Sequence, residues 1–234
     1  MPPPGPQERI LSAVLGLLEE EGVDGVSTRA VGSRANVQAP AIYRLFGDKK
    51  GLLEAAVERG YAQWVADKGE RSLPADPVEA LRVGWDDAVE FGLGHPAMYR
   101  IASSRTTRSS ALSDGADLLR AKVERAAAAG RLRVGQSEAV TLMQATCRGV
   151  ILSLLDSGSG TENARALSTL ARESVISAIT ADTHDDRDPT VATTATTLRA
   201  LLPSAEQLSP AEKALMADWL DRLAAAGHEG RPAG

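Results

Sequence analysis

The stretch that decides the fold runs from Ser27 to Lys50 and reads STRAVGSRANVQAPAIYRLFGDKK. It predicts two short helices, over about 28–35 and 39–46, because Ser27 is a favourable N-cap and Pro40 is tolerated in a first helical turn. Asn36 can adopt the left-handed conformation that a tight turn needs, and Gly47 ends the second helix. Two short helices joined by a tight turn are typical of a helix-turn-helix unit.

This stretch is basic within a chain that is acidic as a whole. Its basic residues are Arg29, Arg34, Arg44, Lys49 and Lys50 against the single acid Asp48, a local charge of +4, whereas the 234-residue chain has a formal net charge of −5. The overall charge argues against a generic nucleic-acid binder. A basic patch on an acidic body nevertheless favours a local nucleic-acid contact.

The second predicted helix has two different sides when it is laid on a helical wheel. The side expected to pack on the first helix holds Ile42, Leu45 and Phe46, and the outward side holds Pro40, Tyr43 and Arg44. An arginine can bind guanine edges or phosphate, and a tyrosine hydroxyl can bind a phosphate oxygen. An ordinary pair of core helices with a solvated basic face gives the same pattern, so the wheel leaves both interpretations open.

The rest of the chain predicts helices throughout, and the expected fold class is all-α. Only 3% of residues are aromatic, and alanine and leucine carry the apolar content, which favours helix over strand. No segment alternates as a half-buried strand does. Helices are expected over about 7–21, 49–68, 77–92, 96–103, 112–129, 137–156, 162–181 and 210–226, the last opened by a Ser209–Glu212 capping box. Residues 103–110 and 183–188 are expected to be polar loops.

Residues 9–64 resemble the DNA-binding domain of the tetracycline-repressor (TetR) family of bacterial transcription regulators. The resemblance is carried by Arg9–Val14, Gly22, Val26–Val31, Ala35–Val37, Ala39–Lys49 and Leu52–Leu53. It implies an N-terminal three-helix helix-turn-helix domain and a larger C-terminal helical bundle for ligand binding and dimerisation. The implied division is a disordered tail at 1–8, a DNA-binding domain at 9–48, a connecting helix at 49–68, a ligand-binding and dimerisation domain at 69–226 and a disordered tail at 227–234.

The resemblance also implies which residues contact DNA. Thr28 and Arg29 are expected to touch the phosphate backbone, and Tyr43 and Lys49 to bind phosphates. The residues expected to face the major groove are Gln38, Ala39, Pro40, Ala41 and Arg44. Ala39 and Ala41 offer only methyl groups where many members carry polar residues, and Leu45 replaces a frequent histidine. Base hydrogen bonding is therefore expected to rest mainly on Arg44 and Gln38, with DNA shape contributing.

The second half of the chain resembles one C-terminal subgroup of the same family. Residues 90–101 (EFGLGHPAMYRI) match its His-Pro-x-x-Tyr-Arg segment, and Arg148-Gly149-Val150 matches its His-Gly pair with arginine in place of histidine. The family architecture implies a homodimer through the helices near 137–156 and 162–181, paired in a four-helix bundle. The first of these is apolar nearly all round, as expected for burial on two sides, although a monomeric core helix has the same pattern.

The resemblance places a ligand pocket among the middle helices. Its candidate wall residues are Trp64, Trp85, Phe91, His95, Met98, Tyr99, Met143 and Cys147. Tryptophan and methionine make large, adaptable walls, but plain core packing explains each residue taken singly. Backbone groups are expected to satisfy His95, and Cys147 is either a redox-sensing thiol or an inert buried residue. The 103–110 loop, with Arg105 and Arg108, either gates the pocket or is simply solvated.

The predicted function is a cytoplasmic TetR-family regulator, a repressor that binds a palindromic double-stranded operator as a homodimer and is released by a small-molecule effector. A regulator controlled by a protein partner and an all-α enzyme are the alternatives. The enzyme is disfavoured because the sequence has no nucleophile elbow, phosphate-binding loop or metal-ligand motif, and no catalytic residue, metal or cofactor is predicted. Residues 1–7 lack the features of a signal peptide, and no apolar run approaches the length of a membrane span.

Overall fold

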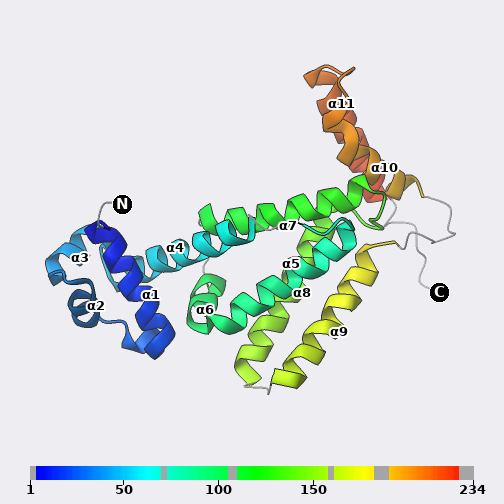
Figure 1. The fold of residues 1–234 in the computed structure, drawn as a ribbon. Coiled ribbons are helices and arrows are strands. Elements are labelled where there is room, and N and C mark those ends of the chain that lie inside the picture. Colours follow the sequence, from blue (N-terminus) through cyan, green and yellow to red (C-terminus); the bar gives the residue numbers. More distant parts are fainter. Residues whose placement is uncertain (1–3, 70–72, 105–109, 158–160, 182–189, 227–234) are drawn as a thin grey trace. The chain divides into compact units, whose positions relative to one another are not determined.

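The computed structural model describes residues 4–69, 73–104, 110–157, 161–181 and 190–226, and within them the chain is all-helical (Figure 1). The all-α prediction is confirmed, and the single β contact in the described part is a bridge between Leu132 and Thr180. The helices are α1 Pro6–Gly25, α2 Thr28–Ala35, α3 Ala39–Phe46, α4 Lys49–Gly69, α5 Pro77–Gly94, α6 Pro96–Ser104, α7 Ser110–Ala128, α8 Gln136–Ser157, α9 Thr161–Ile179, α10 Val191–Leu201, the 3-10 helix η1 Leu202–Ser204 and α11 Pro210–Ala226.

The chain divides into two compact units. The first comprises Met1–Arg71 and Glu90–Ala116, and the second comprises Ser72–Val89 and Asp117–Gly234. The first unit therefore includes α6, which lies beyond the sequence segment that was expected to bind DNA. Helix α1 begins at Pro6, so residues 6–8 of the expected N-terminal tail are helical. The tail from 227 and the polar stretch 183–188 lie outside the described residues.

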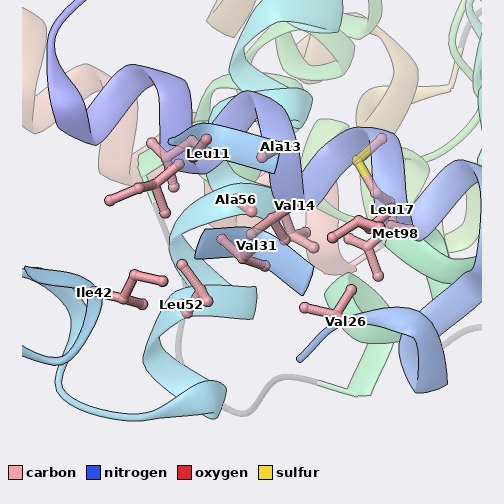
Figure 2. Close-up of a cluster of buried hydrophobic side chains, with 14 of the residues drawn as sticks. Leu11, Ala13, Val14, Leu17, Val26, Val31, Ile42, Leu52, Ala56 and Met98 are labelled. Atoms are coloured by element: carbon pink, nitrogen blue, oxygen red, sulfur yellow. The ribbon is translucent and has the colours of Figure 1, made fainter. Parts of the chain in front are cut away.

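The core of the first unit is built by the amphipathic face of α1. Ile10, Val14 and Leu17 are buried at helical spacing, as the sequence predicts, and they pack with buried residues of α2, α3, α4 and α6 (Figure 2). Helix α1 is interrupted at Gly22, whose positive φ of 71° only glycine adopts readily. The regular part of the helix thus ends near residue 21, where the sequence placed its end.

The core of the second unit is tied together by polar contacts between α5 and α9. Trp85 is fully enclosed, and its indole Nε1 donates a hydrogen bond of 3.0 Å to the Ser168 hydroxyl. Nearby, the Arg82 guanidinium donates to the carboxylate of Glu173 at 3.0–3.2 Å. The Arg82 hydrogen bonds lower the pKa of Glu173, so that carboxylate stays ionised at neutral pH. These long-range contacts fix α9 against α5.

Helix α10 and η1 are absent from the sequence expectations. Threonine occupies five of the eight positions from Thr190 to Thr197, and β-branched residues have low helix propensity. The structure shows why the segment is helical all the same. Thr190 caps it by accepting from the Thr193 amide at 3.2 Å, and the Thr196 hydroxyl donates to the Ala192 carbonyl at 2.9 Å. The predicted capping box of α11 is confirmed by the reciprocal bonds between Ser209 and Glu212.

Candidate nucleic-acid interface

The turn between α2 and α3 has the geometry of a helix-turn-helix. The Ser27 hydroxyl accepts from the Ala30 amide at 3.1 Å and caps α2, and Asn36 adopts a left-handed conformation with a φ of 52°. The Val37 amide then donates to the Gly32 carbonyl at 3.0 Å. A Cβ at Gly32 would lie 2.9 Å from the Val37 carbonyl oxygen, so this turn requires glycine. A glycine four residues before Asn36 is the signal for this requirement in the sequence.

Helix α3 buries one side and exposes the other. Ile42 is 1% exposed and packs in the core of the unit, whereas Tyr43 is 51% exposed and Arg44 is exposed beside it. Gln38 and Pro40 are also exposed at the start of the helix. The outward side predicted from the helical wheel is therefore the outward side of the structure. Ala39 and Ala41 are half-buried, so their methyl groups lie at the margin of this exposed face.

The prediction that Leu45 packs on α2 is wrong. Leu45 is 42% exposed, whereas Phe46 is half-buried and packs against the core cluster. The core-facing direction of α3 is centred between Ile42, Phe46 and Ala39, and Leu45 lies at the edge of that side. An exposed leucine next to Arg44 extends the outward face by an apolar side chain, which suits contact with sugar or thymine methyl groups more than with phosphate.

The connection from α3 to α4 requires two glycines. Gly47 has a φ of 79°, and the Asp48 carboxylate accepts from the Gly51 amide at 2.7 Å, which caps α4. A Cβ at Gly51 would lie 2.3 Å from the Phe46 carbonyl oxygen, so this position admits no side chain. The Lys49 ammonium reaches back to the Val23 carbonyl at 3.4 Å, near the end of α1. Helix α3 thus lies between two turns in which glycine is required.

One of the five basic residues of the stretch is paired within the unit. The Arg34 guanidinium makes two hydrogen bonds to the Glu20 carboxylate, at 2.5 and 2.6 Å. The hydrogen bond between the two groups lowers the pKa of Glu20 and raises the pKa of Arg34. The charge of Arg34 is thus largely compensated by α1. The other four basic residues of the stretch, Arg29, Arg44, Lys49 and Lys50, are exposed.

Five of the eight expected pocket residues belong to the first unit and are packed together there. Phe91 is the centre of an aromatic group, with ring centroids 4.9 Å from Trp64, 5.4 Å from Tyr61 and 5.0 Å from His95. Met98 is buried in the core of the unit, and Tyr99 packs against that core. Tyr61, which has no role in the sequence analysis, is therefore part of this group. The remaining three residues, Trp85, Met143 and Cys147, belong to the second unit.

His95 does not have the surroundings expected from its place before Pro96. Its Nδ1 is enclosed and lies 3.3 Å from a carboxylate oxygen of Glu19 on α1, and it makes no hydrogen bond of good geometry. The expectation that backbone groups satisfy His95 is therefore wrong for Nδ1 among the described residues. Arg105 and Arg108, the charged residues of the expected gating loop, lie outside the described residues.

Cys147 is half-buried on α8, in an environment that makes its thiol unreactive. Burial raises the pKa of its thiol to about 12, and the charge of Asp86 adds to the shift. Since the thiolate is the reactive form, a thiol with this pKa is a poor nucleophile at neutral pH. The structure therefore favours the inert interpretation of Cys147 over the redox sensor.

A second surface lies on the outer face of α8 and α9. Exposed leucines at Leu142, Leu167 and Leu170 stand among the small residues Ala145, Gly149, Ser174 and Ser177. A Cβ at Gly149 would meet nothing within 4 Å, so the backbone of α8 is open to an approaching helix there. By length and composition alone, α8 is apolar enough to cross a membrane, and it is the helix in the described part that meets this criterion.

The comparisons with known proteins agree with the geometry of the first unit. Residues 10–56 match a family described as "Bacterial regulatory proteins, tetR family". The tetracycline repressor protein class A from transposon 1721 of Escherichia coli is 36% identical over 94 residues, which is 40% of this chain and 38% of that protein. The transcriptional repressor KstR of Rhodococcus jostii is 32% identical over 77 residues, 33% of this chain and 36% of that protein. This chain thus covers less than half the length of these curated relatives.

Solved structures resemble the fold over a longer range. A protein of unknown function from Rhodococcus sp. RHA1 has a TM-score of 0.62 at 22% identity and covers 76% of this chain and 97% of its own. A TetR variant from Acinetobacter baumannii AYE, in complex with minocycline, has a TM-score of 0.56 at 25% identity and covers 73% of this chain and 94% of its own. The chain therefore combines an N-terminal segment that matches the tetR family of bacterial regulatory proteins with the all-helical fold of TetR-like structures.

Proposed function

We propose that this chain is a TetR-family transcriptional regulator that binds a palindromic DNA operator as a homodimer. The observation that carries the proposal is the exposed side of α3, where Tyr43 and Arg44 project from a helix whose opposite side is anchored by Ile42. The match of residues 10–56 to the tetR family supports it. The curated relatives named above are repressors, and repression is the mode of action proposed here.

The proposed DNA contacts divide by chemistry. Arg44 and Gln38 are exposed and polar, so they are assigned to base edges in the major groove, with Ala39, Pro40 and Ala41 in apolar contact beside them. Arg29 and Lys49 carry exposed positive charge at the starts of α2 and α4, where helix N-termini also favour phosphate. The hydroxyl groups of Thr28 and Tyr43 are assigned as hydrogen-bond donors to phosphate oxygens of the DNA. Phosphate contacts set the register of the protein, and base contacts supply specificity.

The proposed dimer forms through the outer faces of α8 and α9. Leu170 is 67% exposed although leucine gains free energy on burial, and the small residues around it allow helices to approach closely. Two copies that pack these faces together form a four-helix bundle with two-fold symmetry. This arrangement explains why α8 is apolar on more than one side. A symmetric dimer then predicts a symmetric operator.

The proposed regulation is release from the operator by an apolar small molecule. The candidate contacts in the first unit are those of the aromatic group around Phe91 and Trp64. Minocycline in the Acinetobacter baumannii structure is an example of a ligand held by a TetR-like fold. Helix α4 carries both Lys49 at the DNA-binding end and Trp64 in the aromatic group, so a ligand that moves α4 changes the separation of the two α3 helices. A ligand that binds the state with widely separated α3 helices a few kcal/mol more tightly than the DNA-binding state is sufficient to release the operator.

The DNA-binding proposal is tested by selecting sequences from a pool of random duplexes with the full-length protein. The expected product is a palindrome whose half-sites lie about one helical turn, roughly 34–36 Å, apart. Binding is measured again on the selected duplex and on a duplex with one half-site scrambled, which is expected to bind at least tenfold more weakly. Enrichment of no sequence, or of a site without symmetry, contradicts the proposal.

The release mechanism is tested by the distance between the two DNA-binding units of a dimer. A spin label on Ser33→Cys, at an exposed position of α2, reports this distance, and the unreactive thiol of Cys147 leaves the labelling specific. A compound that releases the operator is expected to shift or broaden the distance distribution relative to the DNA-bound protein. If the compound releases the operator while the distance distribution stays identical to that of the DNA-bound protein, the proposed movement is ruled out.

A further inference from the structure

The helical hairpin formed by α10, η1 and α11 has a small core of its own. The buried apolar residues of this core are Ala195, Leu202 and Leu220, with Leu208, Met216, Ala217 and Ala224 packed against them. The Arg199 guanidinium donates to the Asp221 carboxylate at 3.1 Å and closes one side of the hairpin. A core of this size is small for two helices of 11 and 17 residues, because most of the apolar surface of each helix remains outside it.

The hairpin exposes a second apolar face beside this core. On α11, Leu215, Trp219 and Leu223 follow one another at i, i+4 and i+8, so they form one stripe on the helix. On α10, Leu198 and Leu201 form the corresponding stripe, with Val191 at its start. Trp219 is 52% exposed and Val191 is 68% exposed, and the other four are also exposed among the described residues. We call these six residues the hairpin face.

The two stripes lie on the same side of the hairpin. On α11, Trp219 is rotated by about 100° from the core residue Leu220, and on α10, Leu198 and Leu201 are rotated by about 60° and 120° in the same sense from the core residue Ala195, as follows from the spacing of 100° per residue. Val191, about 40° from Ala195, lies between the stripe and the core. Because α10 and α11 run in opposite directions, equal rotations of the same sense bring both stripes to one side. Asp218 and Asp221 are rotated to the opposite side of α11. The hairpin thus has an apolar side, which Arg222 borders on α11, and an acidic side that holds Asp218 and Asp221.

The area of the hairpin face is large for a surface that faces water. A large apolar or aromatic side chain has a surface of roughly 150–250 Å² when fully exposed. Because about half of each of the six side chains is exposed, together they leave on the order of 500 Å² of apolar surface exposed on each copy. Two such faces packed together bury roughly 1,000 Å², which is near the lower limit for a specific protein–protein interface. Trp219 lies at the centre of its stripe, and tryptophan is the residue type most enriched at the energetic centres of interfaces.

The charges of the hairpin argue against nucleic acid and lipid as its partner. Over residues 190–225 the basic residues are Arg199, Lys213 and Arg222, and the acidic residues are Glu206, Glu212, Asp218 and Asp221, so the hairpin is slightly acidic. Helices that lie on a membrane carry lysine and arginine on their polar face, and nucleic-acid contacts also need positive charge. Arg222 is moreover paired with Asp218 at 3.0 Å. The hairpin face therefore fits an apolar protein surface of equal size.

We propose that the hairpin face of one copy packs against the hairpin face of a second copy of this chain. An apolar two-helix layer is complementary to itself under a two-fold axis, and two layers make a four-helix bundle with a shared core. This contact is separate from the one proposed for α8 and α9 and does not depend on it. With about 1,000 Å² buried, it is a weak contact that forms at micromolar or higher protein concentrations.

Cysteine cross-linking in the full-length protein tests this contact directly. In a Cys147→Ala background, Leu215→Cys, Trp219→Cys and Leu223→Cys place single thiols along the stripe, and Asp218→Cys places one on the acidic side of the same helix. At least one stripe variant is expected to form disulfide-linked pairs of chains about tenfold faster than the Asp218→Cys control under mild oxidation. Equal rates for the stripe and the control overturn the proposal.

Sedimentation at two concentrations separates this contact from the proposed α8–α9 interface. The Leu170→Glu substitution is designed to remove the proposed α8–α9 interface. This variant is expected to be a monomer at about 1 μM and to self-associate at about 100 μM. The double variant Leu170→Glu, Trp219→Glu is expected to be a monomer at both concentrations. A monomer at both concentrations without the Trp219 change overturns the proposal. The proposal is also overturned if Trp219→Glu lowers the melting temperature of the monomer but leaves self-association of the chain unchanged. Binding of the protein to phosphatidylcholine–phosphatidylglycerol vesicles that is lost in Trp219→Glu overturns it as well.

Discussion

Replacing Arg44 by alanine is expected to weaken operator binding by about 2–6 kcal/mol in the dimer, roughly 30-fold to 10⁴-fold in affinity. A bidentate arginine–guanine contact contributes about 1–3 kcal/mol of discrimination, and a symmetric dimer loses the contact in both half-sites. Arg44 is exposed on α3 next to Tyr43. The measurement is fluorescence anisotropy on the selected operator and on duplexes carrying each single base-pair change.

The assignment of Arg44 to a base is tested by how the loss of affinity varies among duplex sequences, more than by the size of that loss. Arg44→Ala is expected to bind all four base pairs at one position of each half-site nearly equally. Arg29→Ala is the matched control, because it removes one exposed arginine at the start of α2 that is assigned to phosphate. It is expected to weaken all duplexes alike and to reduce the salt dependence by about one unit per copy. If Arg44→Ala behaves as Arg29→Ala does, Arg44 binds phosphate and the assignment is wrong.

Leu170→Glu is expected to separate the copies and to lower operator affinity by about 10²–10⁴-fold, because two linked half-site contacts become independent ones. Leu170 is 67% exposed, so the glutamate costs an isolated copy little, but two carboxylates buried in a symmetric apolar contact are strongly unfavourable. Gly149→Glu on α8 is a second route to the same result, since an added Cβ there meets nothing within 4 Å. Mass is measured by sedimentation and affinity by anisotropy, both at nanomolar to low micromolar protein.

Thr169→Glu is the matched control for this experiment. Thr169 is exposed and adjacent to Leu170 on α9, but it is turned about 100° away from the outer face. It is expected to keep the mass, the helical circular dichroism and the operator affinity of the unchanged protein. If the Leu170→Glu and Gly149→Glu proteins stay dimeric and keep full operator affinity, the dimer interface does not lie on α8 and α9.

The helix-turn-helix could be predicted from sequence because its determinants are local. The Ser27 cap, the left-handed Asn36 and the buried Ile42 each act within a few residues, and each is seen in the structure. Gly32 and Gly51 were missed although they lie in the same stretch. Their need for glycine comes from close approach of a backbone oxygen, at 2.9 and 2.3 Å from an added Cβ, and such an approach depends on how the helices turn.

The prediction of the two sides of α3 was wrong at Leu45, which is exposed, and the predicted positive patch was wrong at Arg34. Arg34 counted toward the positive patch, but Glu20, 14 residues earlier in the chain, pairs with it. Helical periodicity finds the side that faces the core, but it places its edges only to within about one residue. It also does not reveal which acid from another helix meets a given base.

The sequence by itself determined the helical class, the positions of most helix ends and the outward side of α3, because caps, turns and the 3.6-residue period act over short distances. Only the tertiary structure decided which residues from distant segments meet. It brought Tyr61, Trp64 and Phe91 into one aromatic group, raised the pKa of the half-buried Cys147 thiol, and left Leu170 and Trp219 exposed. Such outcomes depend on the packing of whole helices, in which each apolar face is buried only if another element covers it.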